Sequence, residues 1–441
     1  MKQIPLRWLS LALCFLMLLS VLSACQTEEV PQGTSSTTTA PVTTEPVTTA
    51  PITTEPVTTE PVTTVPTTTV PGTTVPTTTE PVTEAPETLM PIPENEVFYP
   101  NVSEDDLYES RVLNTIDKNV ADLLKIQGRT ATTSNGITLD WSGSAVEFYA
   151  YFSGDLSMTF TVSPQESVLF RVFVDYEELG TVAVEAGKTK SYVMAESIPE
   201  GRHLVRVLRL TDVETNCVGI MAELCSIELC GVLTNRPEDR AYMIEFLGDS
   251  VTCAVGAKSA YSGGAYADLS FAYKVAQKLN ADYSMVCISG IGTMTGTSRH
   301  NARGDNILTI YDYINHYRTK QVKYSPTRKA DLVVIATNAN DAASPNEKAY
   351  KAHVKELIEL IKKTHGEDVK IMWVFNMYTS RATLDTYVRQ IFKEYGGKEA
   401  GYYTQQLTVD NSGGENHPTA ESHDKYASSI VNLINRENIL P

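Results

Sequence analysis

The sequence lacks several patterns that mark common classes of protein. Positive charge is scarce: the formal net charge is −17, from 36 Lys and Arg against 53 Asp and Glu, and no basic stripe is present. A chain this acidic repels phosphate backbones, so nucleic acid is excluded as a partner. No His-Glu-x-x-His, phosphate loop, dinucleotide fingerprint or Gly-x-Ser-x-Gly elbow occurs. These absences argue against a zinc protease, a nucleotide-dependent enzyme and an α/β-hydrolase.

Cysteine is also sparse, and its spacing matches no zinc site. Five cysteines follow Cys25, an odd number, and each lies among apolar residues typical of strands. Free cysteine in such surroundings behaves as a small hydrophobe, so we expect buried thiols. One disulfide among the first three stays an alternative in an exported chain. The five are Cys217, Cys225, Cys230, Cys253 and Cys287.

The amino-terminal segment predicts export. Lys2 and Arg7 precede an apolar run, 8–21, that is too short for a comfortable membrane span. The run closes with Leu-Ser-Ala-Cys at 22–25, which resembles the lipobox of bacterial lipoproteins. We therefore expect a signal peptide at 1–24 and a lipid anchor on Cys25. The alternative is an ordinary signal peptide that contains a cysteine.

Residues 25–96 predict a disordered linker. They are nearly all Thr, Pro, Val and Glu, in a loose repeat such as Thr-Thr-Glu-Pro-Val at 53–57 and 58–62. Such a segment has no apolar surface to bury, and proline favours extended polyproline II geometry. At about 3.1 Å per residue, a linker of this length spans on the order of 200 Å. It would carry a domain well away from a membrane.

Two folded domains follow. Residues 97–237 show short apolar runs of period two at roughly ten-residue spacing, which predicts a jelly-roll β-sandwich. Its role is either to bind polysaccharide or to pack structurally on its neighbour. Residues 238–441 alternate strand and helix, which predicts a parallel sheet covered by helices. The sandwich strands are expected at 137–141, 145–150, 156–162, 169–174, 180–187, 191–194, 204–210 and 221–232. In the second domain we expect strands at 244–247, 283–288, 331–337 and 370–376, and helices at 270–279, 345–364 and 419–435.

Loops after three predicted strands, and one loop before the last helix, offer the groups that serine hydrolysis needs: a nucleophile, a base and donors to an oxyanion. Ser250 follows the first strand in a Gly-Asp-Ser turn. Gly290 and Asn340 lie in loops after the second and third strands, and His417 directly precedes the last helix. Carboxyl ends of parallel strands share one edge of a sheet, where ligands bind. We expect Ser250 as nucleophile and His417 as general base, against the alternatives of a turn serine and a surface histidine.

This ordered set resembles the SGNH hydrolase superfamily, whose blocks are a Gly-Asp-Ser turn, an oxyanion glycine, a Gly-x-Asn-Asp loop and a late histidine. The preceding sandwich makes the chain similar to carbohydrate esterase family 2, as do segments 128–130, 139–144 and 248–256. The resemblance implies a three-layer, flavodoxin-like α/β domain that needs no metal or organic cofactor. It also implies an oxyanion hole formed by the Ser250 and Gly290 N–H groups and the Asn340 amide. Gly292 is the alternative glycine donor, and His423 a weaker alternative base.

Two departures from the family pattern concern the loops beside the site. Many SGNH enzymes carry Asp three residues before the histidine, where this chain has Gly414. A main-chain carbonyl, Glu415 or Asp410 could orient His417 instead. The other departure is Asn338, where the superfamily pattern has Gly.

A third departure concerns sugar binding. The position before the histidine often carries an aromatic sugar platform in the family, whereas this chain has Asn416. Tyr261, Tyr266 and Tyr273 could provide stacking surfaces in its place.

From these features we expect a monomeric, lipid-anchored, cell-surface esterase that removes O-acetyl groups from plant polysaccharide, xylan or mannan. Family members deacetylate such polymers, so the polysaccharide partner is implied by the resemblance. One alternative is a catalytically weak surface protein that binds polysaccharide. Another is an esterase that acts on acetylated peptidoglycan or another surface glycan.

Overall fold

A computed structural model describes residues 111–440, apart from 217, 260–263 and 318–321. The expected signal segment 1–24, Cys25, the linker 25–96 and Tyr261 lie outside the described residues, as does the first part of the expected sandwich. Those predictions stay predictions. Within the described part of the chain, no helix is long and apolar enough to cross a membrane.

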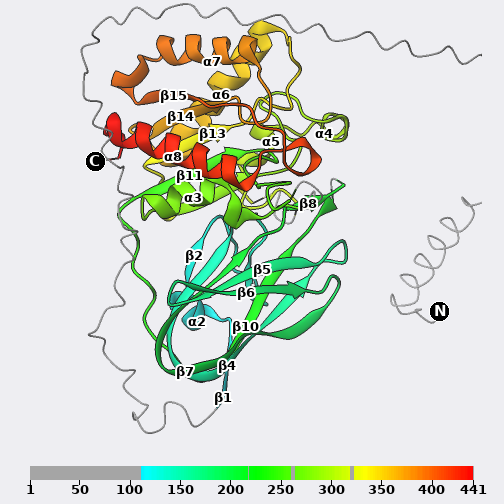
Figure 1. The fold of residues 1–441 in the computed structure, drawn as a ribbon, viewed down its shortest axis with the longest axis vertical. Coiled ribbons are helices and arrows are strands. Elements are labelled where there is room, and N and C mark those ends of the chain that lie inside the picture. The colour runs from blue at the N-terminus through cyan, green and yellow to red at the C-terminus, as the bar shows by residue number, and fades with distance from the viewer. Residues whose placement is uncertain (1–110, 217, 260–263, 318–321, 441) are drawn as a thin grey trace, which may run out of the picture. The chain divides into compact units, whose positions relative to one another are not determined.

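The first domain is an antiparallel sheet of eight strands that curves around its own core (Figure 1). The strand order is β1-β10-β4-β7-β5-β6, with β2 paired to β4 and β3 paired to β10. Every second residue of β5 is buried, as expected of a strand with one face on a core. The strands are β1 (Arg111–Thr115), β2 (Lys125–Gln127), β3 (Ile137–Thr138), β4 (Ala145–Val162), β5 (Val168–Val174), β6 (Glu177–Val184), β7 (Thr189–Arg209) and β10 (Ala222–Leu233), with a short helix α2 (Lys118–Asp122) after β1 and a separate hairpin of β8 (Glu214–Thr215) and β9 (Val218–Gly219).

Two of the predicted strand breaks in this domain are wrong. The segments 145–150 and 156–162 belong to the single strand β4, and 191–194 and 204–210 belong to β7. The pairing of β4 with β7 shifts register around Gly154 without ending. Turn residues there form β-bulges, which bend a strand while its pairing continues.

The second domain is a parallel sheet of five strands in the order β12-β11-β13-β14-β15. In this flavodoxin-like order the first strand lies between the second and third, and ligands bind at the carboxyl edge beside it. The strands are β11 (Met243–Gly248), β12 (Asp282–Cys287), β13 (Leu332–Ala336), β14 (Lys370–Phe375) and β15 (Tyr402–Gln406). The predicted parallel α/β domain is confirmed, although β15 was not among the expected strands.

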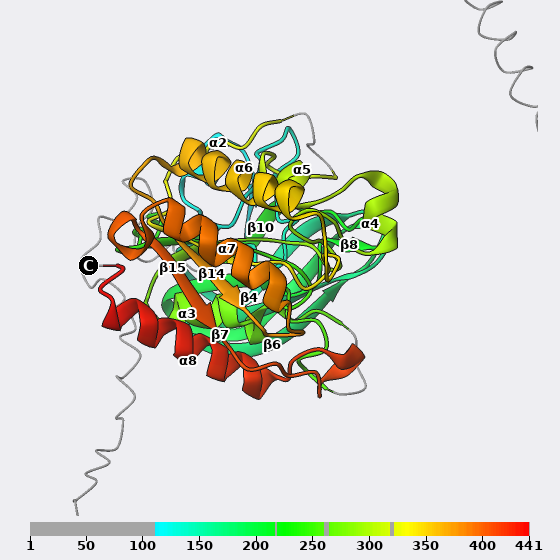
Figure 2. The same cartoon turned by 90° about the horizontal axis from the view of Figure 1, so that it is seen from above.

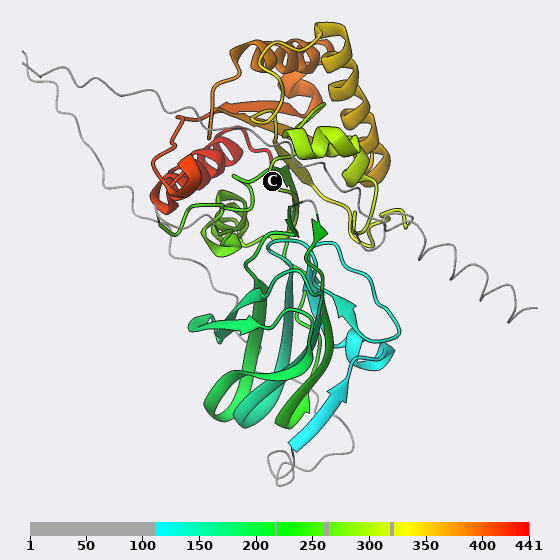
Figure 3. The same cartoon turned by 90° about the vertical axis from the view of Figure 1, so that its right-hand side faces the viewer.

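Helices cover both faces of this sheet (Figure 3). Phe271 of α3 and Ile430 of α8 share a core with Phe246 of β11, whereas Val388 of α7 packs with Trp373 of β14 in the core on the other face. Seen from above, β14 and β15 lie between α7 and α8 (Figure 2). The helices are α3 (Phe271–Lys278), α4 (Ser298–Arg303), α5 (Ile307–Tyr311), α6 (Glu347–His365), α7 (Ala382–Glu394) and α8 (Ala420–Arg436), with 3-10 turns η2 (Ala267–Leu269), η3 (Gly397–Ala400) and η4 (Gly414–Asn416).

The described cysteines are free thiols. Cys253 and Cys287 are buried, as predicted, but Cys225 and Cys230 are half-exposed, so the expectation of burial is wrong for these two. Both lie on β10, where they occupy partly exposed positions between buried neighbours. Cys217 lies outside the described residues.

Arg129 joins the two domains through a buried ion pair. Its guanidinium donates through Nε and Nη2 to the two carboxylate oxygens of Glu245 on β11, each at 3.0 Å. Both side chains are 0% exposed. The guanidinium also lies over the rings of Tyr311 and Tyr324, 4.5 and 3.9 Å from their centroids. Burial alone raises the pKa of a carboxyl group, but Arg129 and His365 outweigh it and lower the pKa of Glu245 to about 2.

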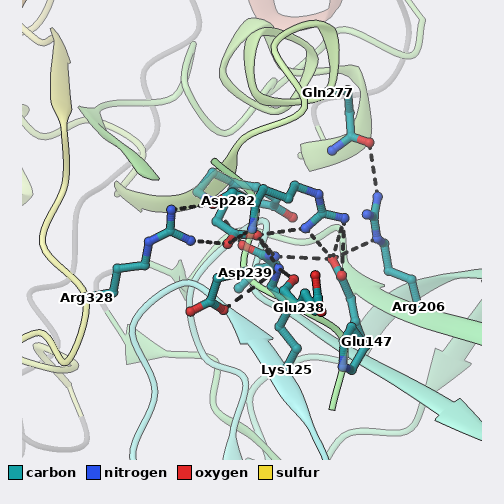
Figure 4. A network of polar contacts seen from close by, with 12 residues as sticks. Lys125, Glu147, Arg206, Glu238, Asp239, Gln277, Asp282 and Arg328 are labelled. Atoms are coloured by element: carbon teal, nitrogen blue, oxygen red, sulfur yellow. Dashed lines mark hydrogen bonds and ion pairs between the residues drawn. The ribbon is translucent and has the colours of Figure 1, made fainter. Parts of the chain in front are cut away.

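A second network of charges crosses the interface between the domains (Figure 4). Glu147 on β4 pairs with Arg206 at 3.0 Å and with Arg240 at 3.2 Å. Asp282, the first residue of β12, pairs with Lys125 at 2.7 Å and with Arg240 at 2.8 Å. Because Arg240 contacts both carboxylates, it links the sandwich to the parallel sheet.

Removing the Arg129 side chain should strongly destabilise the protein. Arg129→Met leaves the Glu245 carboxylate buried without its main partner, which typically costs about 3 to 5 kcal/mol. We expect the free energy of unfolding, measured in denaturant on residues 97–441, to fall by that amount. The control is Lys425→Ala, which removes an exposed pair with Glu421 and should cost under about 1 kcal/mol. An equal fall in the free energy of unfolding in the two variants would contradict the prediction.

Candidate active site

Ser250 lies in a tight turn immediately after β11. The turn is close-packed: a Cβ added at Gly248 would lie 1.8 Å from Thr252 Oγ1, so only glycine fits there. The Asp249 carboxylate accepts the Val251 N–H at 3.0 Å, and the Ser250 carbonyl accepts the Val255 N–H at 3.0 Å. These bonds hold the serine at the carboxyl edge of the sheet.

The structure brings Ser250 and His417 together. His417 Nε2 is 2.7 Å from Ser250 Oγ, and His417 Nδ1 is 3.0 Å from the main-chain carbonyl oxygen of Glu415. A carbonyl oxygen only accepts hydrogen bonds, so Nδ1 must carry the ring hydrogen. The lone pair of Nε2 therefore faces the serine hydroxyl. Burial lowers the pKa of His417, which keeps the ring neutral and able to accept a proton.

Main-chain bonds tie the histidine loop to the nucleophile loop. Gly414 N–H donates to the Gly256 carbonyl at 2.9 Å, and Ala420 N–H donates to the Ala257 carbonyl at 3.2 Å. A Cβ at Gly256, whose φ is +71°, would lie 2.0 Å from the Gly414 oxygen. The close approach of the two loops therefore requires glycine at 256.

The two carboxylates considered as orienters of His417 make other contacts. Glu415 contacts the imidazole through its main chain, and its side chain belongs to an exposed residue. The Asp410 carboxylate accepts the Thr419 N–H at 3.0 Å and the Ser412 hydroxyl at 2.6 Å, so it stabilises the turn before α8. The contact to Nδ1 comes from the main-chain carbonyl of Glu415.

His423 belongs to the hydrophobic core. It is fully buried, its Nδ1 accepts the Phe271 N–H at 3.1 Å, and its ring stacks on the Phe271 ring. Burial lowers the pKa of His423 to about 3. This histidine is a structural residue of α8.

The expected oxyanion residues lie in loops on either side of Ser250. Gly290 follows β12 and Asn340 follows β13, and both strands are paired with β11. The Asn340 amide donates to the Ile291 carbonyl at 3.0 Å and to Asp249 at 3.3 Å, so it bridges the two neighbouring loops. The alternative glycine, Gly292, is buried, and a Cβ added there would lie 2.4 Å from the Thr295 carbonyl oxygen.

Asp341 organises the loop after β12, a role that the sequence did not suggest. Its carboxylate accepts the N–H groups of Thr293, Met294 and Thr295, each at 2.8 Å. Three donors converging on one buried carboxylate fix the path of the chain next to Gly290. The Asp that follows Asn340 thus acts on the neighbouring loop.

Asn338 keeps the left-handed conformation at the position where the superfamily pattern has glycine. Its φ is +69°, a region that Asn tolerates better than most residues. Its side-chain amide donates to Asp385 at 2.9 Å, and Arg381 donates to the next carbonyl, that of Ala339, at 2.9 Å. The departure from glycine is therefore accommodated without loss of the turn.

Tyr378 is a site residue that sequence reasoning missed. It comes shortly after β14, and its ring stacks on the imidazole of His417 with centroids 4.8 Å apart. The signal available in the sequence was its position after a buried strand, at the same sheet edge as Ser250. The ring covers one face of the imidazole and contributes to its burial.

A cleft of about 870 Å³ opens beside the loops that carry Gly290 and Glu415. Both domains line it: Glu166, Asp212 and Glu214 come from the sandwich, and Gly290, Arg299 and Glu415 come from the α/β domain.

Among the tyrosines expected to stack on sugar, Tyr266 lines this cleft. Tyr273 is buried against Arg206, so the expectation that it forms a stacking surface is wrong.

Comparison with known proteins agrees with this architecture. Residues 126–225 match the model of the carbohydrate esterase 2 N-terminal domain, and residues 244–437 match that of GDSL-like lipases and acylhydrolases. Cellulase/esterase CelE of Acetivibrio thermocellus is 25% identical over 317 residues, which are 67% of this chain and 37% of CelE. The chain thus spans little more than a third of that relative's length.

Solved structures show the same fold at lower identity. A family two carbohydrate esterase from Clostridium thermocellum in complex with cellohexaose is 23% identical, with a TM-score of 0.63 over 72% of this chain and 100% of that one. The acetyl xylan esterase Est2A from Butyrivibrio proteoclasticus is 19% identical, with a TM-score of 0.66 over 75% of this chain and 100% of that one. These likenesses confirm the predicted jelly roll followed by an SGNH domain.

The order of the two matches agrees with the observed order of the two domains, a sandwich followed by a flavodoxin-like parallel sheet. The resemblance to carbohydrate esterase family 2 is thereby confirmed: the amino-terminal domain matches the model of that family's N-terminal domain, and the carboxyl-terminal domain matches that of GDSL-like acylhydrolases.

Exposing His417 should raise its pKa. Tyr378→Ala removes the ring that covers the imidazole, and burial is what lowers the pKa of His417 below its ordinary value of 6.5. We expect the pKa, measured by NMR titration of the ring protons, to move upward towards that value. Tyr378→Phe keeps the ring and should leave the pKa where it is. An unchanged or lower pKa in Tyr378→Ala would show that the tyrosine does not shield the histidine.

Proposed function

We propose that the chain is a carbohydrate O-deacetylase that works through a Ser-His acyl-enzyme mechanism. The single observation that carries this proposal is the 2.7 Å contact between Ser250 Oγ and His417 Nε2, with the opposite ring nitrogen bonded to a carbonyl. This arrangement leaves an unprotonated nitrogen facing a hydroxyl, as a general base requires.

The proposed reaction proceeds in two halves. Ser250 Oγ attacks the carbonyl carbon of the acetyl group while His417 Nε2 takes the hydroxyl proton. The tetrahedral intermediate collapses as His417 returns that proton to the departing sugar oxygen, and an acetyl-enzyme remains. Water, deprotonated by the same nitrogen, then attacks the acetyl carbonyl, and acetate leaves as the proton returns to Ser250.

The negative oxygen of each tetrahedral intermediate needs hydrogen-bond donors. We assign this role to the N–H groups of Ser250 and Gly290 and to the Asn340 amide, whose longer contact, at 3.3 Å to Asp249, would give way to the oxyanion. The supporting observation is that the loops after β12 and β13 flank the nucleophile turn. One such donor typically contributes about 2.7 to 4 kcal/mol to transition-state stabilisation.

The proposed substrate is acetylated plant polysaccharide, with xylan and mannan as the two candidates. The names of Est2A and of the cellohexaose complex concern those proteins, and they support a polysaccharide here. Glu166, Glu214 and Glu415 give the cleft an acidic lining, against one arginine, Arg299. An acidic lining disfavours polymers of uronic acids through like-charge repulsion, so a neutral backbone fits better.

Acetate release tests this function directly. Purified residues 97–441 should release acetate from acetylated xylan or acetylated glucomannan, and Ser250→Ala should abolish release because it removes the nucleophile. His423→Gln changes the buried histidine of α8 and serves as a folding-sensitive control that should retain the activity. If the parent releases no acetate and leaves p-nitrophenyl acetate intact, the esterase proposal fails. Binding of insoluble glycan by that inactive protein would instead favour a carbohydrate-binding role.

We further propose that the protein is exported and held at the cell surface by a lipid on Cys25. The supporting pattern is Leu-Ser-Ala-Cys at 22–25 after a short apolar run.

The anchor can be tested in a bacterial host that processes lipoproteins. Full-length protein should fractionate with membranes and incorporate labelled palmitate, and Cys25→Ser should remove both properties because it deletes the acceptor sulfur. Cys230→Ser, at another cysteine, should keep both. Membrane association that survives Cys25→Ser would contradict a lipid anchor at this position.

A further inference from the structure

His300 is a buried histidine beside the proposed oxyanion site. It lies on α4 and is 1% exposed. Its Nε2 is 2.9 Å from the main-chain oxygen of Ser289 and 3.2 Å from Oε1 of Glu214. Both of these oxygens accept hydrogen bonds, so Nε2 carries the ring hydrogen and donates it.

The oxygen that His300 contacts belongs to the same peptide group as the Gly290 N–H. A peptide group is planar and trans, so its C=O and N–H point in opposite directions. A donor that fixes the Ser289 carbonyl therefore also fixes the direction of the Gly290 N–H. The histidine acts on the oxyanion donor through one rigid amide.

Gly290 is held on its carbonyl side, where its oxygen accepts the Thr297 N–H at 2.9 Å. Its φ is +84°, a conformation that glycine adopts readily. A Cβ there would lie 2.9 Å from Thr297 Cγ2 and 3.3 Å from His300 Cδ2, so no larger side chain fits against α4. Glycine adopts many backbone conformations. The direction of the Gly290 N–H therefore depends on the contacts that hold the Ser289–Gly290 peptide.

Glu214, the second partner of His300, belongs to the sandwich. It lies on β8, and the hairpin of β8 and β9 sits on Tyr317 of the α/β domain: Tyr317 donates its hydroxyl hydrogen to Glu214. A Cβ at Gly219 of β9 would lie 2.4 Å from Tyr317 Cβ, so the hairpin packs directly on that residue. Arg299, next to His300, donates to Asn216 in the same hairpin.

We infer that His300, held by Glu214, is a positioning residue that aims the Gly290 N–H into the oxyanion hole. The sandwich thereby contributes to catalysis as well as to folding, through a chain of contacts from Glu214 to His300 to the Ser289–Gly290 peptide. This inference rests on the proposed function, because it assigns Gly290 its role as an oxyanion donor.

The first test separates positioning from folding. His300→Ala should lower kcat for p-nitrophenyl acetate by about 10- to 100-fold, less than the 10²- to 10³-fold that losing an oxyanion donor costs. KM should change by less than about twofold, because a positioning residue acts through the Ser289–Gly290 peptide and does not itself bind the substrate. His300→Gln retains a side-chain N–H donor and should recover part of the loss. The matched control is His365→Gln, a buried histidine that contacts Glu245 at 3.0 Å; it should lower the melting temperature and leave kcat unchanged.

The second test measures how well the oxyanion hole binds a negatively charged oxygen. An alkyl trifluoromethyl ketone forms a tetrahedral adduct with a catalytic serine, and its oxygen requires the same donors. We expect its inhibition constant to rise in His300→Ala by the factor by which kcat falls. Glu214→Ala should raise it by a smaller factor, about 3- to 10-fold, because His300 loses only one of its two anchors.

Each outcome decides between the two proposals. A folded, active His300→Ala enzyme with unchanged kcat would overturn the positioning role alone. So would a lowered kcat with an unchanged inhibition constant, because the loss would then lie outside the oxyanion hole. A parent protein without any esterase activity would overturn the proposed function, and this inference with it.

Discussion

The buried pairing of Arg129 with Glu245 is the contact on which the joining of the two domains depends. A carboxylate inside a parallel sheet is costly unless an opposite charge and hydrogen bonds reach it. Arg129 brings that charge from the sandwich, and His365 of α6 contacts the same carboxylate at 3.0 Å. The sheet that carries Ser250 is therefore completed by a residue from another domain, which favours the structural interpretation of the sandwich over that of a detachable binding module.

The contacts between the two domains also place part of the sandwich at the carboxyl edge of the parallel sheet, where Ser250 lies. The pairs around Glu147 and Asp282 fix the sandwich at the amino end of the parallel strands, and the hairpin of β8 and β9 reaches the cleft beside Gly290. The interface at one end thus determines which side chains of the sandwich line the cleft at the other.

Much of this organisation could be predicted from the sequence, because it follows from local pattern. The periodicity of strands and helices predicts both fold classes. The position of Ser250, Gly290 and Asn340 after successive parallel strands, with His417 before the last helix, predicts that these residues share one edge of the sheet. The orienting group could not be identified, because a main-chain carbonyl leaves no mark in residue types. Contacts between distant segments, such as Tyr378 on His417, were missed for a related reason: nothing local to either residue requires them.

A carbonyl orienter gives the proposed catalytic pair, Ser250 and His417, a distinct electrostatic character. An aspartate both fixes the histidine tautomer and stabilises the imidazolium that forms during the reaction. The Glu415 carbonyl achieves the first, since it binds the Nδ1 hydrogen, but carries no full charge for the second. The imidazolium is then less stable, in keeping with the lowered pKa of the buried His417. A base of this kind stays neutral to lower pH but accepts a proton less readily. In the proposed mechanism, the site therefore depends more heavily on its oxyanion donors. Precise aim of the Gly290 N–H therefore matters more here than it would beside a full triad.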